Sequence, residues 1–260
     1  MANPLHLLAS PARFQRWSAR VLPVAAAIAV LAIAWGLYDG LVLSPADYQQ
    51  GDSVRIMYVH VPAAWMAMLC YAVMALFSVS FLIWKHQLAD LGARASSPIG
   101  AAFTAVALIT GSLWGKPTWG TWWVWDARLT SVLILFFFYL GHMALSHAFD
   151  DSERGGKAAA ILAIVGAVNL PIVKFSVDWW NTLHQPESLL RLDGPTIHPS
   201  MLAPLLVMGV GFTALYVVLL MIRMRSELLG RRIEVLQRAR AGAADPGRHE
   251  AAGAERSGSG

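Results

Sequence analysis

Tryptophan is concentrated in one short segment of the chain, Trp114–Arg128. Five of the eleven tryptophans fall within twelve positions there: Trp114, Trp119, Trp122, Trp123 and Trp125. Two glycines and one proline in its first half favour irregular backbone over helix. Large rigid rings on such backbone, followed by Asp126 and Arg128, predict a platform for a large flat ligand with a charged edge. The simpler alternative is an aromatic belt, but a belt would spread over both membrane interfaces.

Two histidines are candidate ligands of a metal carried by such a molecule. His60 stands at the entry of an apolar run, and His184 lies in the loop between the last two apolar runs. Haem is the obvious flat ligand, and neutral imidazole is a common axial ligand of its iron. Either histidine alone is explained more simply as an interfacial side chain bonded to a carbonyl group. The pair beside a tryptophan-rich segment favours axial ligation, whereas His198 is predicted to cap or pack a helix.

Haem carries two propionates, which an arginine can pair with in a bidentate manner. Arg128 and Arg55 are the leading candidates for this role, with Lys116 and Arg191 behind them. Asp126 is an acceptor that we expect to orient Arg128 or a tryptophan N–H rather than to contact iron. An ion pair with Asp126 or a lipid headgroup contact remains the alternative role for Arg128.

The composition is that of an integral membrane protein, with 57% hydrophobic and 14% charged residues, against about 25% charged in soluble domains. Six apolar runs approach the ~20 residues needed to cross a bilayer. Each must be helical, because lipid offers the backbone no hydrogen-bond partners. The predicted fold is therefore all-α with six transmembrane helices. They are expected at Val21–Leu43, Val59–Trp84, Ile99–Trp114, Leu129–Phe149, Ala158–Val177 and Pro199–Ile222.

The distribution of lysine and arginine predicts the orientation. Fifteen of the twenty lie in the termini and in the loops that share their side, and five lie in the other loops. Both termini are therefore predicted to be cytoplasmic. Residues 1–20 form a cytoplasmic segment, residues 21–225 the membrane domain with its outward tryptophan-rich loop at 114–128, and residues 226–260 a cytoplasmic tail. The tail is rich in Ala, Gly, Arg and Ser after Ala239 and is predicted to be disordered at its end.

The cysteine content, the apolar spans and the positions of the histidines disfavour several classes of function. The single cysteine, Cys70, excludes an internal disulfide and a thiolate-rich metal site. A small-molecule transporter would place ionisable groups at mid-membrane, and the predicted spans contain almost none. A haem-dependent redox subunit would hold histidine pairs inside the spans, whereas His60 and His184 lie at the outer edge. These two classes remain the alternatives to a haem-binding and haem-transfer protein that is not an enzyme.

The segment Trp119–Ser131 resembles the tryptophan-rich signature of the haem-handling proteins of cytochrome c maturation, called the WWD domain. Six spans, a histidine at the start of the second, a histidine in the last outer loop and a length near 260 resemble the CcmC family in particular. The resemblance covers roughly Phe14 to Arg232. It implies a bacterial inner-membrane protein that binds haem b transiently at its periplasmic face, with His60 and His184 as axial ligands. It also implies delivery to the haem chaperone CcmE, beside the membrane complex of CcmA, CcmB and CcmD.

Overall fold

The computed structural model describes residues 10–184 and 194–244, and this part of the chain is helical apart from its connections and one isolated bridge between Asp47 and Gly51. The helices are α2 (Pro11–Tyr38), α3 (Met57–Trp84), α4 (Gln87–Trp119), α5 (Ala127–His147), α6 (Ser152–Ala167), α7 (Asn169–Trp179) and α8 (Pro199–Ala244). A π-helical turn, η1 (Asp39–Leu43), extends α2, and a 3₁₀ turn, η2 (Asp52–Ile56), precedes α3. Six helical segments are long and apolar enough to cross a membrane, which confirms the all-α, six-span prediction.

The third span is much longer than predicted. We expected Ile99–Trp114 to be the shortest, but α4 contains 33 residues. Apolar composition did not predict the first turns of α4, because they carry the charged residues Asp90 and Arg94. These two side chains pair with each other at 2.9 Å inside the bundle. Small residues around them pack against neighbouring helices, so burial of polar groups in protein, rather than apolar composition, stabilises this part of the helix.

The prediction that glycine and proline break the helix from Trp114 onward was wrong. Helix α4 continues through Gly115 and Pro117 and ends at Gly120, which has a φ of 76°. The Gly120 N–H donates to the carbonyl of Lys116 at 3.1 Å and closes the last turn. Irregular backbone is therefore confined to residues 120–126, and the first two tryptophans of the cluster lie on a helix.

The fifth span is divided into two helices. Helix α6 ends at Ala167, Val168 forms a turn, and α7 begins at Asn169. Pro171 explains the break, because its ring would clash with the carbonyl group four residues earlier.

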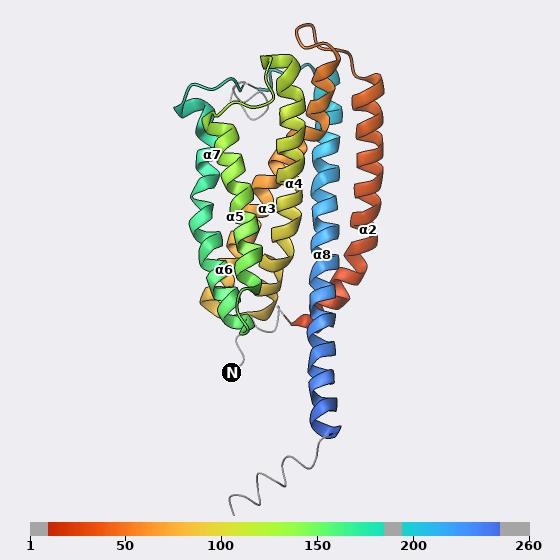
Figure 1. The fold of residues 1–260 in the computed structure, drawn as a ribbon. Coiled ribbons are helices and arrows are strands. Elements are labelled where there is room, and N and C mark those ends of the chain that lie inside the picture. The colour runs from red at the N-terminus through yellow and green to blue at the C-terminus, as the bar shows by residue number, and fades with distance from the viewer. Residues whose placement is uncertain (1–9, 185–193, 245–260) are drawn as a thin grey trace, which may run out of the picture.

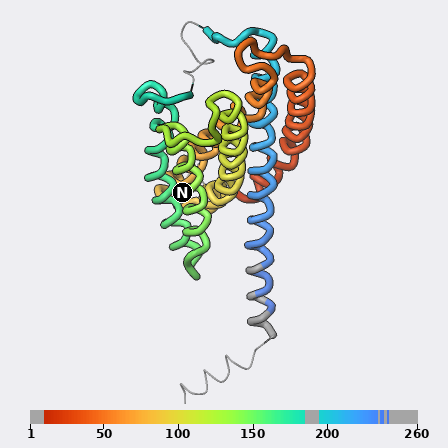
Figure 2. Tube along the Cα trace, turned by 45° about the horizontal axis from the view of Figure 1, so that its top comes forward, coloured from red at the N-terminus to blue at the C-terminus, as the bar shows by residue number. Residues whose placement is uncertain are grey.

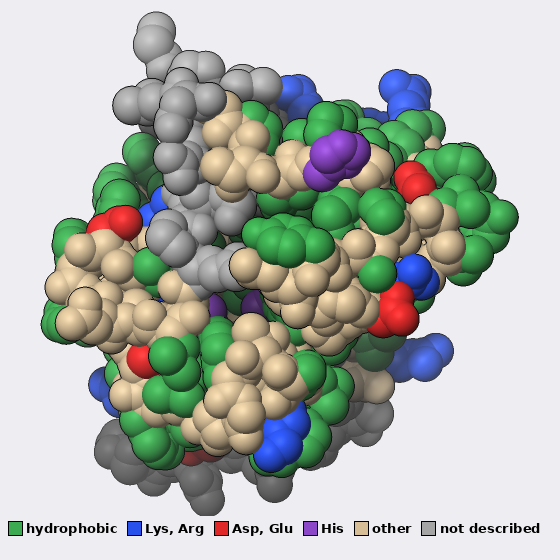
Figure 3. Space-filling view, turned by 90° about the horizontal axis from the view of Figure 1, so that it is seen from above, with side chains coloured by type: hydrophobic (Ala, Val, Ile, Leu, Met, Phe, Trp, Pro, Cys, Tyr) green, Lys and Arg blue, Asp and Glu red, His purple; other side chains and the backbone are tan. Residues whose placement is uncertain are grey.

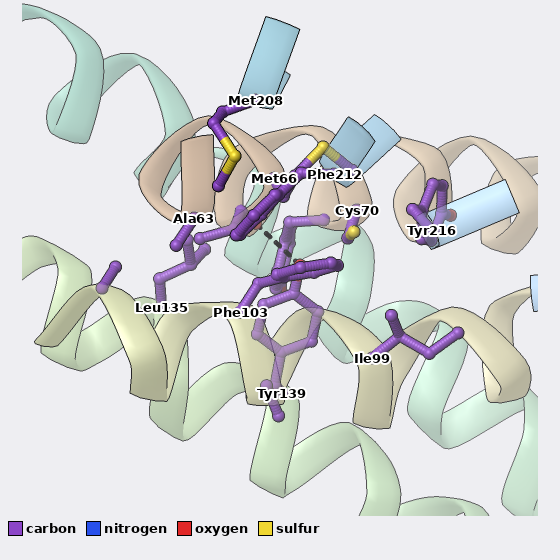
Figure 4. Packing of buried hydrophobic residues seen from close by; sticks show 14 of the residues in the cluster. Ala63, Met66, Cys70, Ile99, Phe103, Leu135, Tyr139, Met208, Phe212 and Tyr216 are labelled. Carbon is purple, nitrogen blue, oxygen red and sulfur yellow. Dashed lines mark hydrogen bonds between the residues drawn. The ribbon is translucent and has the colours of Figure 1, made fainter. Parts of the chain in front are cut away.

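The bundle is held together by close contacts among α3, α4 and α5. Tyr139 on α5 is fully buried, and its hydroxyl donates to the backbone oxygen of Ala67 on α3 at 2.8 Å. A Cβ at Gly100 on α4 would lie 2.1 Å from the Tyr139 ring, so only glycine allows the helices to approach this closely. Figure 4 shows Tyr139 among the core residues contributed by these helices and by α8. This packing positions the three helices that carry most of the candidate site.

The loops outside the lysine- and arginine-rich side are predicted at about residues 44–58, 115–128 and 178–198. Their described residues lie at one end of the bundle, the top of Figure 1. The start of α2, the α3–α4 connection and the α5–α6 connection lie at the opposite end. Helix α8 continues well beyond the bundle at that opposite end (Figure 2), past the predicted span and through the first part of the predicted tail. Residues 245–260, where disorder is predicted, lie outside the described residues. Which end faces the cytoplasm remains a prediction from the charge distribution.

Cysteine labelling in intact cells checks that orientation. Thr118 and Gln237 are both exposed and lie at opposite ends of the molecule. We expect Thr118→Cys to react with a membrane-impermeant thiol reagent before lysis and Gln237→Cys to react only after lysis. Cys70 is fully buried and should stay unlabelled, which provides the internal control. Labelling of Gln237→Cys in intact cells would reverse the predicted orientation.

Candidate functional site

A cavity of about 1020 Å³ opens at the loop end of the bundle, at the upper limit of the ~300–1,000 Å³ usual for small-molecule sites. It is lined by residues of α3, α4, α5, α7 and α8, and both His60 and His184 contribute to its wall. Figure 3 shows this face, with histidine side chains visible at the bottom of a hollow. The structure therefore brings together two candidate ligands that are far apart in the sequence.

The ring of His60 is fixed by helix α4. Its Nδ1 lies 3.1 Å from Thr110 Oγ1, and that hydroxyl already donates to the carbonyl of Val106 at 2.6 Å. Because the hydroxyl has one proton, Thr110 must accept from His60, and Nδ1 carries the ring proton. The Nε2 atom of neutral His60 then has a free lone pair. The edge of the Trp114 ring packs against the imidazole, with centroids 5.7 Å apart.

His184 is fixed in the same way by Asp126. The His184 Nδ1 lies 3.0 Å from Asp126 Oδ2, and a carboxylate can only accept, so Nδ1 again carries the proton and Nε2 the lone pair. Trp119 packs edge-on against the ring at a centroid distance of 4.8 Å. We had expected Asp126 to orient Arg128 or a tryptophan N–H, and the structure shows that it orients His184.

Asp126 is itself held in place as the N-cap of α5. Its Oδ1 accepts from the Leu129 N–H at 2.7 Å, as N-cap carboxylates do. Burial raises its pKa, but hydrogen bonds from Leu129 and His184 outweigh that effect, and the pKa of Asp126 is lowered overall. Asp126 is therefore ionised at neutral pH and available to accept from His184.

His184 is neutral at pH 7. Burial lowers its pKa, and the hydrogen bond and charge of Asp126 only partly oppose this, so the pKa of His184 stays below the ordinary histidine value. Neutral imidazole is the form that binds a metal. A hydrogen bond from the second ring nitrogen to a carboxylate, as in His184, is a common way of orienting metal-ligating imidazoles in proteins.

The five clustered tryptophans do not form one continuous platform. Among them, Trp114 lines the cavity, and its Nε1 donates to Gln50 Oε1 at 2.7 Å. Trp119 supports His184. Trp122 and Trp125 point outward and are 55% and 75% exposed, while Trp123 packs against Trp125 with centroids 5.4 Å apart. The segment thus combines groups directed at the cavity with an exposed aromatic surface.

The candidate cations also divide into two groups. Arg128 lines the cavity, and its guanidinium donates to Ser176 Oγ at 3.1 Å and to the backbone oxygen of Lys174 at 3.2 Å, both on α7. Arg55 is outside the cavity lining and pairs with Asp52 at 3.2 Å. Its guanidinium also donates to the carbonyls of Leu41 and Ser44, so it stabilises the first outer loop.

Among the described residues, Lys116 is also outside the cavity lining. Lys116 donates to the Gly120 carbonyl at 3.0 Å and lies 5.8 Å from the centre of the Trp122 ring. Arg191 lies outside the described residues. Lys174 does line the cavity, and we did not single it out from the sequence. A lysine within an otherwise apolar span was the available signal.

Comparison with known proteins shows the family of this chain. A family model described as haem exporter protein C, CcmC, matches residues 4–239. The chain belongs to the CcmC family. It is 58% identical over 230 residues to haem exporter protein C of Bradyrhizobium diazoefficiens, covering 88% of this chain and 87% of the relative. The Escherichia coli K12 protein of the same name is 48% identical over 229 residues, covering 88% and 92%.

One relative carries a mitochondrial name. A protein of Marchantia polymorpha named as a ccmC-like mitochondrial protein of cytochrome c biosynthesis is 51% identical over 179 residues, covering 69% of this chain and 75% of its own length. The CcmC family match includes every candidate site residue and most of α8. It therefore confirms the family indicated by the WWD resemblance, over a longer stretch than the motif residues alone covered.

Proposed function

We propose that this CcmC-family protein binds haem b as a transient cargo at the periplasmic face of the bacterial inner membrane and delivers it to the haem chaperone CcmE. The observation that carries the proposal is that two histidines of one cavity have the same hydrogen-bonding pattern. His60 and His184 line one cavity, and each uses Nδ1–H to bond a second residue, which leaves Nε2 for iron. The haem exporter name of the family supports a carrier rather than an enzyme.

The polar groups of the cavity suit the edge of the same cargo. Arg128 is held by two hydrogen bonds to α7, and Lys174 lies beside it in the cavity lining. Both are cations that could neutralise a carboxylate in a partly buried site. The apolar remainder of the lining, which includes Trp114, Met68 and Leu205, would contact the porphyrin ring.

The exposed aromatic surface suits the delivery step. Trp122 and Trp125 are exposed and belong to the α4–α5 connection, which lies at the loop end of the bundle (Figure 1). Tryptophan is over-represented among the residues that dominate protein interfaces. We propose that they form the docking surface for CcmE. Assembly with CcmA, CcmB and CcmD is proposed from family membership.

A transfer assay separates docking from haem binding. We expect Trp122→Ala/Trp125→Ala to retain haem with an unchanged Soret band and to pass it to purified apo-CcmE about tenfold more slowly, since an interface tryptophan contributes roughly 1–2 kcal/mol or more. Trp17 is similarly exposed, at 57%, but lies at the other end of the bundle. Trp17→Ala should transfer haem at the original rate. Equal rates in the double variant and the unsubstituted protein would remove Trp122 and Trp125 from the docking surface.

A further inference from the structure

A third histidine contributes to the same cavity. His198 immediately precedes α8, is exposed, and lines the cavity with His60 and His184. We had expected it only to cap or pack a helix. It does cap α8, because its backbone oxygen accepts from Met201 and Leu202 at 2.9 and 3.0 Å. Because His198 also lines the cavity, it is placed to contact a bound ligand in addition to capping α8.

The hydrogen bonds of His198 select the opposite tautomer from the other two histidines. The backbone N–H of Ser200 donates to His198 Nδ1 at 3.4 Å, and the Ser200 hydroxyl lies 2.8 Å from the same atom. A backbone N–H can only donate, so Nδ1 is an acceptor here. The neutral ring therefore carries its proton on Nε2, whereas His60 and His184 carry theirs on Nδ1.

This difference determines what each ring can bind. A protonated Nε2 has no lone pair to give to iron, but it is a good donor to an oxygen acceptor. The proposed cargo offers such acceptors at its edge, because the carboxylates of haem are ionised and accept only. Arg128 belongs to α5 and bonds to α7, while His198 precedes α8, so the cavity presents donors from two separate parts of the bundle.

We propose that His198 is a cargo-binding residue that donates a hydrogen bond from Nε2 to a haem carboxylate, and that it is not an iron ligand. This inference rests on the proposed function and adds a specificity determinant to it. It predicts that His198 distinguishes haem from the same porphyrin with esterified carboxylates. His60 and His184 would not make that distinction, because they bind the metal.

The test compares two porphyrins in the purified full-length protein. His198→Ser keeps an N-cap side chain and removes the donor. We expect this variant to release haem to an excess of apomyoglobin about tenfold faster than the unsubstituted protein, as expected for loss of a hydrogen bond to a charged group. Release of haem dimethyl ester should be accelerated much less, because an ester carbonyl is an uncharged and weaker acceptor. The Soret band of bound haem should keep its position.

A matched control is available at the other end of the bundle. His86 caps α4 through the same atom, with its Nδ1 accepting from the Leu88 N–H at 3.2 Å. It belongs to the α3–α4 connection, which lies at the end of the bundle opposite the loops (Figure 1). His86→Ser should leave the release of both porphyrins unchanged, which separates capping from cargo binding.

Three results would overturn the inference. Equal acceleration of haem and ester release would mark His198 as structural, unchanged release of both would remove it from the site, and a shifted Soret band would make it an iron ligand. Failure of the proposed function looks different, since the unsubstituted protein would then bind neither porphyrin. In that case the role of His198 is overturned as well.

Discussion

Replacing both His60 and His184 by alanine is expected to abolish stable haem binding. Each single variant should lose one axial position and shift the Soret band, and the double variant should lose haem during size-exclusion chromatography. The loss should exceed the ~10- to 100-fold produced by changing residues that hydrogen-bond to metal ligands, because the ligands themselves are removed. Absorption spectra of protein purified from membranes at equal expression levels measure the effect.

The controls for this prediction come from the same bundle. His147 is exposed and lies at the opposite end, so His147→Ala should retain the spectrum of the unsubstituted protein. Added imidazole should partly restore the Soret band of a single variant by occupying the vacated position. An unaltered spectrum in the double variant would show that the iron ligands lie elsewhere.

Asp126→Asn should weaken haem binding by about 10- to 100-fold without unfolding the protein. Asparagine can still cap α5, but it replaces the ionised acceptor that selects the ring tautomer of His184. Asp126→Ala should lose the cap as well and cost roughly 1 kcal/mol more in stability. Haem titration and thermal unfolding in detergent, measured on the same samples, separate the two effects.

The equivalent change for His60 is Thr110→Val. It keeps the shape of the side chain and removes the acceptor of His60 Nδ1, so it should weaken haem binding to a similar extent.

The control for the Asp126 variants is a second aspartate that caps a helix. Asp151 caps α6 by accepting from the Glu153 N–H at 2.9 Å, and the α5–α6 connection to which it belongs lies at the opposite end of the bundle. Asp151→Asn should leave haem affinity unchanged. Unchanged haem affinity in Asp126→Asn would contradict a role for the carboxylate in orienting His184.

Much of the architecture was predictable, because a bilayer imposes simple requirements. Apolar length alone identified six spans, and the structure confirms them. The ends of the helices were less predictable where side chains are surrounded by protein instead of lipid. The early turns of α4 hold Asp90 against Arg94 and Arg231, at 2.9 and 2.7 Å, and a hydropathy argument cannot anticipate charges that are neutralised inside the bundle.

The sequence by itself determined which residue types were present for the chemistry and that they share one end of the molecule. The tryptophan cluster, the two histidines and Arg128 could all be named from composition, spacing and the family resemblance. Only the tertiary structure decided which of these residues line the cavity. Trp114 lines the cavity, whereas Trp125 is exposed and Arg55 is outside the lining. Lys174 and His198 line the cavity as well.

The physical reason is that a histidine's role depends on which of its two nitrogens is occupied. Thr110, Asp126 and Ser200 make that choice for His60, His184 and His198 respectively. The first two partners are 50 and 58 residues away from their histidines in the chain. Spacing along the sequence does not encode such contacts, because they arise only when α3, α4, α5 and the last outer loop meet around one cavity.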